Sequence, residues 1–321
     1  MAVLITRRSS FGVREQGFAL VGGASGDDGV RRREPDAPTG EDRSLRGRWM
    51  KAACIAVLTI ALVCDRFGAR AHAQTPDSAR TLGEVVQSDL SAIGADALRI
   101  AAAPLHFNAQ DWAVTAAVVG GTAVLFSLDR TARQSAHESI SPSADRVFNL
   151  GREYGREIYA LSLSGGLYAG GLLLKSNDLR TTGRMLFESV AIAGVLNMAL
   201  KSLIGRSRPQ TDEGPFRFRG FQSSLEHTSL PSGHTTVAFS VSSILASRLR
   251  NRYASIGLYA LASVTAGSRV YHDNHWLSDT FLGAALGTAV GLAVARTDEA
   301  SPDLGLLVEP SVSGLRVVYV F

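Results

Sequence analysis

Residues 268–279 read Ser-Arg-Val-Tyr-His-Asp-Asn-His-Trp-Leu-Ser-Asp and lie between two apolar, Ala/Gly-rich segments, 255–266 and 281–295. Ionisable groups are costly in apolar surroundings, so such a cluster indicates a functional site. His275 and Asp279 are four residues apart and are therefore neighbours on one helical face. An aspartate there accepts a hydrogen bond from one imidazole nitrogen and leaves the other as a nucleophile or a base. Taken alone, the cluster is equally compatible with a polar link between two helices.

Six apolar segments set the expected architecture. They cover residues 112–128, 158–174, 185–204, 235–246, 255–266 and 281–295, joined by short polar links. Most are shorter than, or close to, the ~20 residues that a bilayer span requires, and their Ala, Gly and Ser residues allow close helix packing. We therefore expect an all-α fold, a helical bundle of about six core helices. Composition leaves open whether the bundle is membrane-embedded or compact and soluble.

Two further segments flank this bundle. From Thr81 to Ala103 the apolar residues recur at helical spacing, which predicts an N-terminal amphipathic helix. Residues 304–308 and 315–321 surround Ser311-Val312-Ser313-Gly314 and predict a short β-hairpin-like tail. The expected division is an amphipathic helix and linker at 74–109, a helical-bundle domain at 110–297 and a C-terminal tail at 298–321.

The first 73 residues differ from the rest of the chain. Residues 1–49 lack periodicity, so we expect them to be disordered or to precede a true start at Met50. Residues 50–73 combine a basic lead, an apolar run and the small-x-small site Ala71-His72-Ala73, a pattern typical of a secretory signal peptide. An uncleaved membrane anchor is the alternative.

Charge and cysteine usage narrow the function classes. Residues 1–73 hold 12 Lys/Arg and 8 Asp/Glu, an excess equal to the formal net charge of +4. The remainder has no basic field of the kind that nucleic-acid binding requires. Both cysteines, Cys54 and Cys64, also lie in this leading region. Residues 74–321 therefore contain no disulfide, no thiolate nucleophile and no cysteine metal site.

Two other clusters precede residues 268–279. The first reads Lys201-Ser202-Leu203-Ile204-Gly205-Arg206-Ser207-Arg208-Pro209 and ends the third apolar segment. Lys201 and Arg208 are seven residues apart, about two helical turns, so both can reach a common anion. Basic decoration of a helix C-terminus is an equal alternative.

The second cluster, Pro231-Ser232-Gly233-His234, opens the fourth apolar segment. Ser232 and Gly233 fall where backbone N–H groups lack helical partners, which is a natural phosphate-binding position. His234 lies beside that anion and can donate a proton to a leaving group. A plain serine cap with an incidental histidine is the alternative.

The three clusters together fit phosphoryl transfer. Lys201, Arg208 and Arg269 supply cations, and the start of the fourth helix supplies N–H donors, for the charge of a phosphoryl transition state. His234 and His275 supply proton transfer and nucleophilic attack. The chain offers no carboxylate set suited to two metal ions. We infer metal-free phosphoryl transfer through a phosphohistidine.

The chain resembles the type 2 phosphatidic acid phosphatase superfamily, which includes vanadium haloperoxidases and bacterial non-specific acid phosphatases. The resemblance rests on Lys201-x6-Arg208-Pro209, Pro231-Ser232-Gly233-His234 and Ser268-Arg269-x5-His275-x3-Asp279, and covers roughly residues 110–296. It implies a helical bundle with no cofactor. It also implies these roles: phosphate binding by Lys201, Arg208, Ser232, Gly233 and Arg269, acid catalysis by His234, phosphorylation of His275, and orientation of His275 by Asp279.

The expected function is hydrolysis of a phosphomonoester or diphosphate, on a phosphorylated lipid such as a phosphatidate or polyprenyl diphosphate. Val270-Tyr271 and His275-Trp276 with Ser278-Asp279 resemble the lipid-phosphatase branch more than the soluble acid phosphatases. We expect a cell-envelope location in contact with the membrane, with the site on the periplasmic side. The alternatives are a vanadate-dependent haloperoxidase, a soluble periplasmic acid phosphatase and a membrane scaffold without activity. His272 and Asp273 fall outside the pattern and are interpreted as rim residues.

Overall fold

The computed structural model describes residues 81–299, 305–311 and 314–320. The expected disordered start and signal peptide lie outside the described residues. The helices and strands are α2 (Leu82–Ala102), α3 (Ala109–Glu138), α4 (Pro142–Tyr154), α5 (Glu157–Leu173), α6 (Asn177–Ile204), α7 (Gly233–Leu249), α8 (Arg252–Tyr271), α9 (Leu277–Glu299), β1 (Gly305–Ser311) and β2 (Gly314–Val320). The all-α prediction is confirmed.

The two strands pair antiparallel, with Gly305 opposite Val320 and Ser311 opposite Gly314. The predicted hairpin in the C-terminal tail is therefore confirmed. The amphipathic helix is confirmed as α2, where Thr81 and Glu84 form a reciprocal capping box at the N-terminus.

Helix α4 was not among the predicted helices, because its sequence is too polar to form an apolar segment. Local signals for it are nevertheless present. The Ser141 side chain accepts a hydrogen bond from the Ala144 N–H, and Pro142 occupies the first turn. The polar link predicted between residues 128 and 158 is thus largely helical, since α3 also extends to Glu138.

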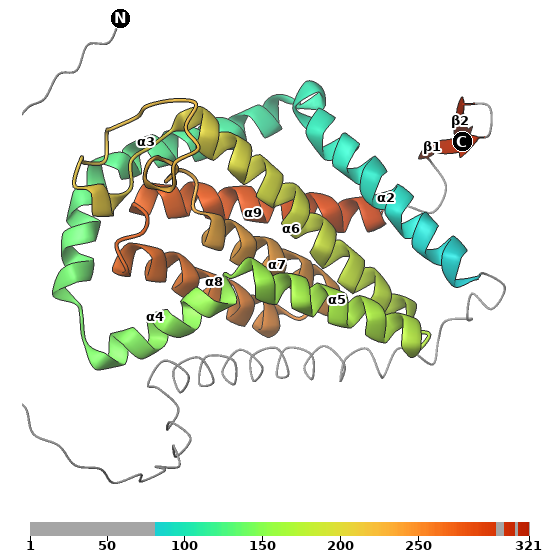
Figure 1. Ribbon diagram of the computed structural model, residues 1–321, viewed down its shortest axis with the longest axis horizontal. Helices are drawn as coiled ribbons and strands as arrows, with labels where there is room; N and C mark the ends of the chain where they lie inside the picture. The colour runs from blue at the N-terminus through green and yellow to red at the C-terminus, as the bar shows by residue number, and fades with distance from the viewer. Residues whose placement is uncertain (1–80, 300–304, 312–313, 321) are drawn as a thin grey trace, which may run out of the picture. The chain divides into compact units, whose positions relative to one another are not determined.

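Helix α7 lies at the centre of the bundle and packs against α6, α8 and α9 (Figure 1). Its contact with α9 is close because Gly283, Gly287 and Gly291 face it; a Cβ at Gly287 would overlap the Thr236 carbonyl. This packing brings the N-termini of α7 and α9 together. The Ser232 N–H donates to the Asp279 carbonyl at 2.9 Å. Two of the predicted clusters therefore meet.

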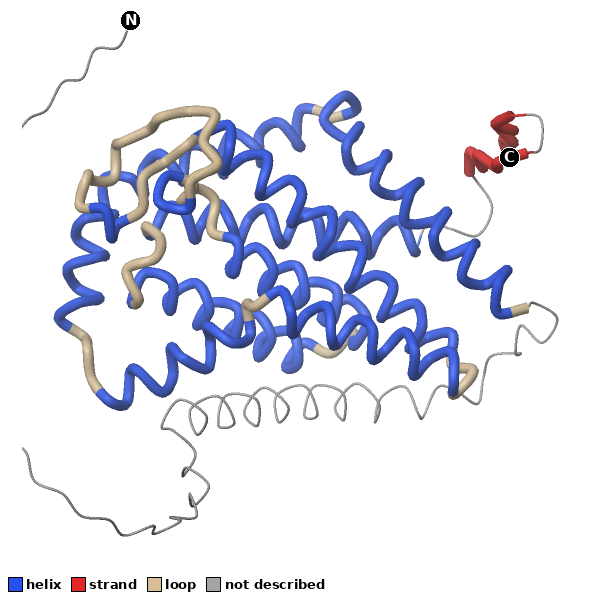
Figure 2. Tube along the Cα trace, in the orientation of Figure 1, coloured by secondary structure: helices blue, strands red, loops and turns tan. Residues whose placement is uncertain are grey.

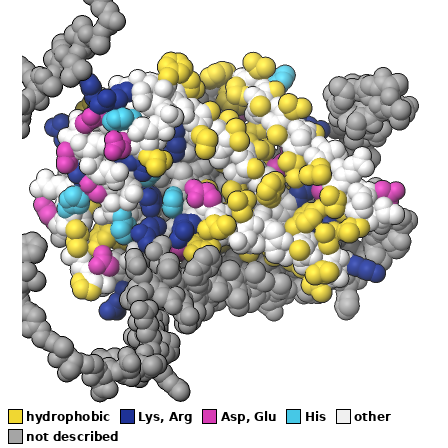
Figure 3. Space-filling model, in the orientation of Figure 1, with side chains coloured by type: hydrophobic (Ala, Val, Ile, Leu, Met, Phe, Trp, Pro, Cys, Tyr) yellow, Lys and Arg dark blue, Asp and Glu magenta, His cyan; other side chains and the backbone are white. Residues whose placement is uncertain are grey.

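Three helices, α3, α6 and α9, are long and apolar enough to cross a membrane. Their outer faces carry exposed apolar side chains, including Val119 on α3 and Val195 and Met198 on α6. Figure 3 shows hydrophobic side chains over the face formed by α5 and α6, whereas charged side chains and histidines gather at the end where α6 terminates. The bundle thus has an apolar wall and one polar end.

Candidate active site

The predicted site residues converge at this polar end. Figure 2 shows the loop between α6 and α7 and the loop between α8 and α9 at the same end of the bundle. Gly205, with φ of +61°, ends α6. In the loop between α6 and α7, the Ser229 N–H donates a hydrogen bond to the Arg206 carbonyl at 2.9 Å. In the loop between α8 and α9, the His275 N–H donates to the Arg269 carbonyl at 3.2 Å. Both loops are fixed by their own backbone.

His275 and Asp279 form a buried pair. His275 Nδ1 lies 3.6 Å from Asp279 Oδ2, and the two residues are 3% and 0% exposed. Ser229, which the sequence analysis did not select, bridges them: its hydroxyl donates to Asp279 Oδ2 and lies 3.4 Å from His275 Nδ1. The Trp276 N–H also donates to Oδ2, at 2.9 Å. The arrangement occupies Nδ1 and leaves Nε2 as the nitrogen for attack.

Burial keeps His275 neutral. It lowers the pKa of this imidazole well below its ordinary value, although hydrogen bonding to Asp279 raises it. The cations of Lys201 and Arg208 lower the pKa further. A neutral imidazole retains the lone pair that a nucleophile needs.

The cation cluster consists of Lys201, Arg208 and Arg269. Lys201 Nζ donates to the Thr228 carbonyl at 2.8 Å, and Arg208 Nε donates to the Leu225 carbonyl at 2.6 Å. Among the described residues, no carboxylate lies within ion-pair distance of these three side chains. Arg269 is 6% exposed, and its Nε has no hydrogen-bond partner within that part of the chain. A buried donor of this kind favours an anionic ligand.

The N-terminus of α7 lies beside this cluster. Ser232 precedes the helix, and its side chain does not bond to the backbone of the first turn. A Cβ on Gly233 would lie 3.9 Å from Lys201 Cε and 3.8 Å from Glu157 Oε1, so Gly233 keeps this space open. Free N–H groups and Lys201 thus approach the same region.

His234 is the second residue of α7. Burial, with the charge of Arg269 next in size, lowers the pKa of its imidazole to about 3. A phosphate dianion among these cations would act in the opposite direction and raise the pKa. Protonation of His234 is therefore coupled to occupation of the site by an anion.

His272 and Asp273 contribute to the loop. His272 Nδ1 lies 2.7 Å from the Ser268 carbonyl. Asp273 accepts two hydrogen bonds from the Arg133 guanidinium, both at 2.7 Å, and this joins the loop to α3.

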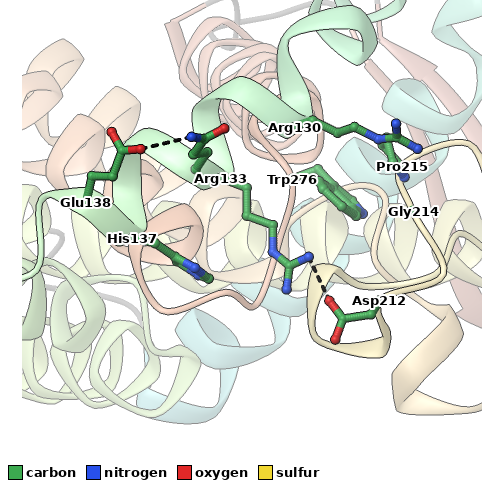
Figure 4. Close-up of a pocket in the computed structure, with 9 residues that line it drawn as sticks. Arg130, Arg133, His137, Glu138, Asp212, Gly214, Pro215 and Trp276 are labelled. Carbon is green, nitrogen blue, oxygen red and sulfur yellow. Dashed lines mark hydrogen bonds and ion pairs between the residues drawn. The ribbon is translucent and has the colours of Figure 1, made fainter.

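An open cavity of about 690 Å³ lies near this connection and is lined by side chains that include Arg130, Arg133, His137, Asp212 and Trp276 (Figure 4). None of the predicted site residues lines it. It is separate from the cation cluster.

Two further residues outside the predicted set contact Asp279 or its helix. Arg206 donates to Asp279 Oδ1 from the buried interior, although only its neighbours Lys201 and Arg208 received roles from the sequence. Asp129, on α3, accepts a hydrogen bond from the Ser278 N–H at 2.9 Å. No spacing rule connects residue 129 with residue 278, so this contact has no signal in the sequence.

Part of the chain matches a known family. Residues 183–302 match the model of the PAP2 superfamily. A lipid A 1-phosphatase of Porphyromonas gingivalis is 32% identical over 117 residues, which are 35% of this chain and 23% of that protein. A lipid A 1-phosphatase of Rhizobium etli is 34% identical over 118 residues, 35% of this chain and 49% of that protein. The matches thus span half or less of these relatives.

Two solved structures are also similar. The LpxE protein of Aquifex aeolicus aligns with a TM-score of 0.42 and 19% identity, covering 53% of this chain and 95% of that one. A transmembrane PAP2 type phosphatidylglycerolphosphate phosphatase of Bacillus subtilis aligns with a TM-score of 0.48 and 23% identity, covering 58% and 96%.

Proposed function

We propose that the chain, whose residues 183–302 match the PAP2 superfamily, is a metal-independent phosphatase acting on phosphomonoester or diphosphate groups of a lipid through a phosphohistidine. The observation that carries this proposal is the buried His275–Asp279 pair beside three cations that lack carboxylate partners among the described residues. The pair supplies a neutral nucleophile, and the cations supply the site for its anionic target.

The first step forms a bond from His275 Nε2 to phosphorus and breaks the bond from phosphorus to the leaving oxygen. Protonated His234 gives its proton to that oxygen. The cation cluster and the N–H groups at the start of α7 bind the equatorial oxygens. Asp279 stabilises the positive charge on the imidazole through Nδ1.

The second step hydrolyses the phosphohistidine. His234, now neutral, takes a proton from water, and the water oxygen attacks phosphorus. The phosphorus–Nε2 bond breaks, inorganic phosphate leaves, and both histidines return to their starting states. The balance requires water alone as co-reactant.

We propose a phosphorylated lipid as the substrate, at a membrane. The three helices suited to crossing a bilayer and their exposed apolar faces support membrane association. Two of the relatives are lipid A 1-phosphatases, so a glycolipid phosphate is the first lipid to test, followed by phosphatidate and a polyprenyl diphosphate.

The site is proposed to face the periplasm, because residues 50–73 have the pattern of an exported chain. This orientation requires either an additional crossing, by residues 83–103, or a bundle that is not fully inserted. A protease site or a cysteine introduced at Phe221, in the loop between α6 and α7, tests this. We expect it to be cleaved or labelled in cells whose inner membrane is intact. Labelling only after the inner membrane is opened would contradict it.

Release of inorganic phosphate from these lipids and from p-nitrophenyl phosphate, measured with EDTA present, tests the function. We expect turnover by the wild type and a loss of about 10³-fold or more in His275→Ala. His272→Ala, in the same loop, is the matched control and should retain activity. Turnover that EDTA abolishes, or an active His275→Ala variant, would overturn the mechanism.

A further inference from the structure

Arg206 is 0% exposed and lies on the side of Asp279 away from His275. Its Nη1 donates to Asp279 Oδ1 at 2.5 Å, while Oδ2 of the same carboxylate faces His275. Its Nη2 donates to Asp129 Oδ2 at 2.6 Å. One guanidinium therefore connects the carboxylate of the nucleophilic pair to a second carboxylate on α3.

Asp129 holds the start of α9 as well. Its Oδ1 accepts from the Ser278 N–H at 2.9 Å, and its Oδ2 accepts from the Ser278 hydroxyl at 2.7 Å. Ser278 is the second residue of α9, so its N–H is one of those without a helical partner. Asp129 thus caps α9 from another helix, one residue before Asp279.

The position of the Arg206 guanidinium is fixed from all sides. Nε donates to the Pro215 carbonyl at 2.9 Å. The Phe126 ring lies 4.4 Å from the guanidinium carbon, and the rings of Trp276 and Phe218 lie 5.6 Å and 5.7 Å away. Such a side chain has one orientation, and it imposes one orientation on the carboxylate that it binds.

We propose that Arg206 and Asp129 are positioning residues: they hold Asp279 with Oδ2 toward His275 and balance the charge around it. Asp129 lies outside the 183–302 region that matches the family, so the phosphatase site extends into α3. This inference rests on the proposed function.

The charges around Asp279 are balanced by these residues. Arg206 has two carboxylates to neutralise it, so Asp279 retains negative charge to stabilise the imidazolium that forms when His275 is phosphorylated. Without Asp129, Arg206 alone would compete with His275 for the Asp279 charge. Neither residue contacts the cation cluster, so binding of the substrate phosphate should not depend on them.

Kinetics of Asp129→Asn and Arg206→Lys test the proposal, with p-nitrophenyl phosphate and a lipid phosphate as substrates. Asp129→Asn removes the negative charge of the carboxylate, and Arg206→Lys removes the planar set of guanidinium donors. Each variant keeps the approximate volume of the side chain. We expect kcat to fall about 10- to 100-fold with KM unchanged. The control is Asp178→Asn, which removes an ion pair with Arg248 between α6 and α7 at 3.2 Å, and should leave kcat unchanged.

A double-mutant cycle separates positioning from general structural damage. If Asp129 acts through Asp279, then Asp129→Asn should cost little further kcat in an Asp279→Asn background. If the fold-losses in kcat of Asp129→Asn and Asp279→Asn multiply in the double variant, the proposal is overturned. A wild-type kcat in Asp129→Asn, or an effect on KM alone, would also overturn it.

Ser278→Ala provides a smaller perturbation should the charged variants not fold. It removes the hydroxyl that bonds both Asp129 and Arg206. We expect kcat to fall about threefold to tenfold with KM unchanged; an unchanged kcat would overturn the proposal. Failure of the proposed function is a different outcome, because the wild type itself would then release no phosphate from any substrate.

Discussion

Two buried arginines at the same end of the bundle differ in their partners. Arg206 is 0% exposed, with two carboxylates, a carbonyl and three aromatic rings around its guanidinium. Arg269 is 6% exposed, and its Nε lacks a partner among the described residues. Removing a charge from water is costly, and partners offset that cost only for Arg206. The comparison separates a cation that holds the protein together from one that awaits a ligand.

Arg206→Met should lower the free energy of unfolding the most, by about 3–5 kcal/mol, because it leaves Asp129 and Asp279 as buried charges without a cation. Denaturant unfolding in detergent micelles measures this. An Arg206→Met variant as stable as the wild type would contradict the structural role given to Arg206.

Arg269→Met is the matched substitution in the cation cluster. It should leave stability unchanged, because the guanidinium has few partners, and should lower kcat/KM about 10²- to 10³-fold by removing a donor to the transition state. Unfolding and phosphate-release assays on the same preparation measure both. A large loss of stability with full activity would reverse the assignment of the two arginines.

Inorganic phosphate should stabilise the wild type by about 1.4 to 2.7 kcal/mol at roughly ten to a hundred times its Kd. Arg206→Lys should keep this response, whereas Arg269→Met should lose most of it. Unfolding curves with and without phosphate give the difference. An equal response in Arg269→Met would show that the anion binds elsewhere.

Mild acidification, over about the first pH unit below 6.5, should produce the smallest effect. His234 lies outside the three candidate spans, and burial together with Arg269 lowers the pKa of its imidazole from 6.5 to about 3. Between these values the unfolded chain binds a proton that the folded chain does not, so stability falls as pH falls from about 6.5 to 3, by up to about 1.4 kcal/mol per pH unit.

His234→Gln should remove this contribution and leave a shallower dependence of unfolding on pH. The His275 imidazole has a lowered pKa as well, and its share should persist in the variant. Identical pH profiles for wild type and variant would contradict the account of His234.

The sequence predicted the fold and the eight residues assigned to the site, because both depend on local patterns. Apolar segments predicted α3 and α5 to α9, and short motifs at helix ends selected residues such as Lys201, His234 and His275. The structure brings these motifs to one end of the bundle, and the roles assigned to them remain predictions.

The parts that sequence reasoning missed depend on packing between distant segments. Asp129 contacts Ser278 across 149 positions, and Ser229 reaches Asp279 across 50. In the sequence, Asp129 looks like the ordinary polar residue that ends an apolar segment, and Arg206 looks like one more of the basic residues around it. Helix α4 was missed because its polar sequence gave no apolar period. Only tertiary contacts distinguish these residues.

The central claim is that His275 carries the phosphoryl group, and trapping of the phosphoenzyme tests it most directly. Purified protein is quenched at high pH during turnover of a lipid phosphate, and its peptides are analysed by mass spectrometry. We predict one phosphate on His275, with a reduced amount in Asp129→Asn and none in His275→Ala. Steady turnover with His275 unmodified, or phosphate on another residue, would contradict the account.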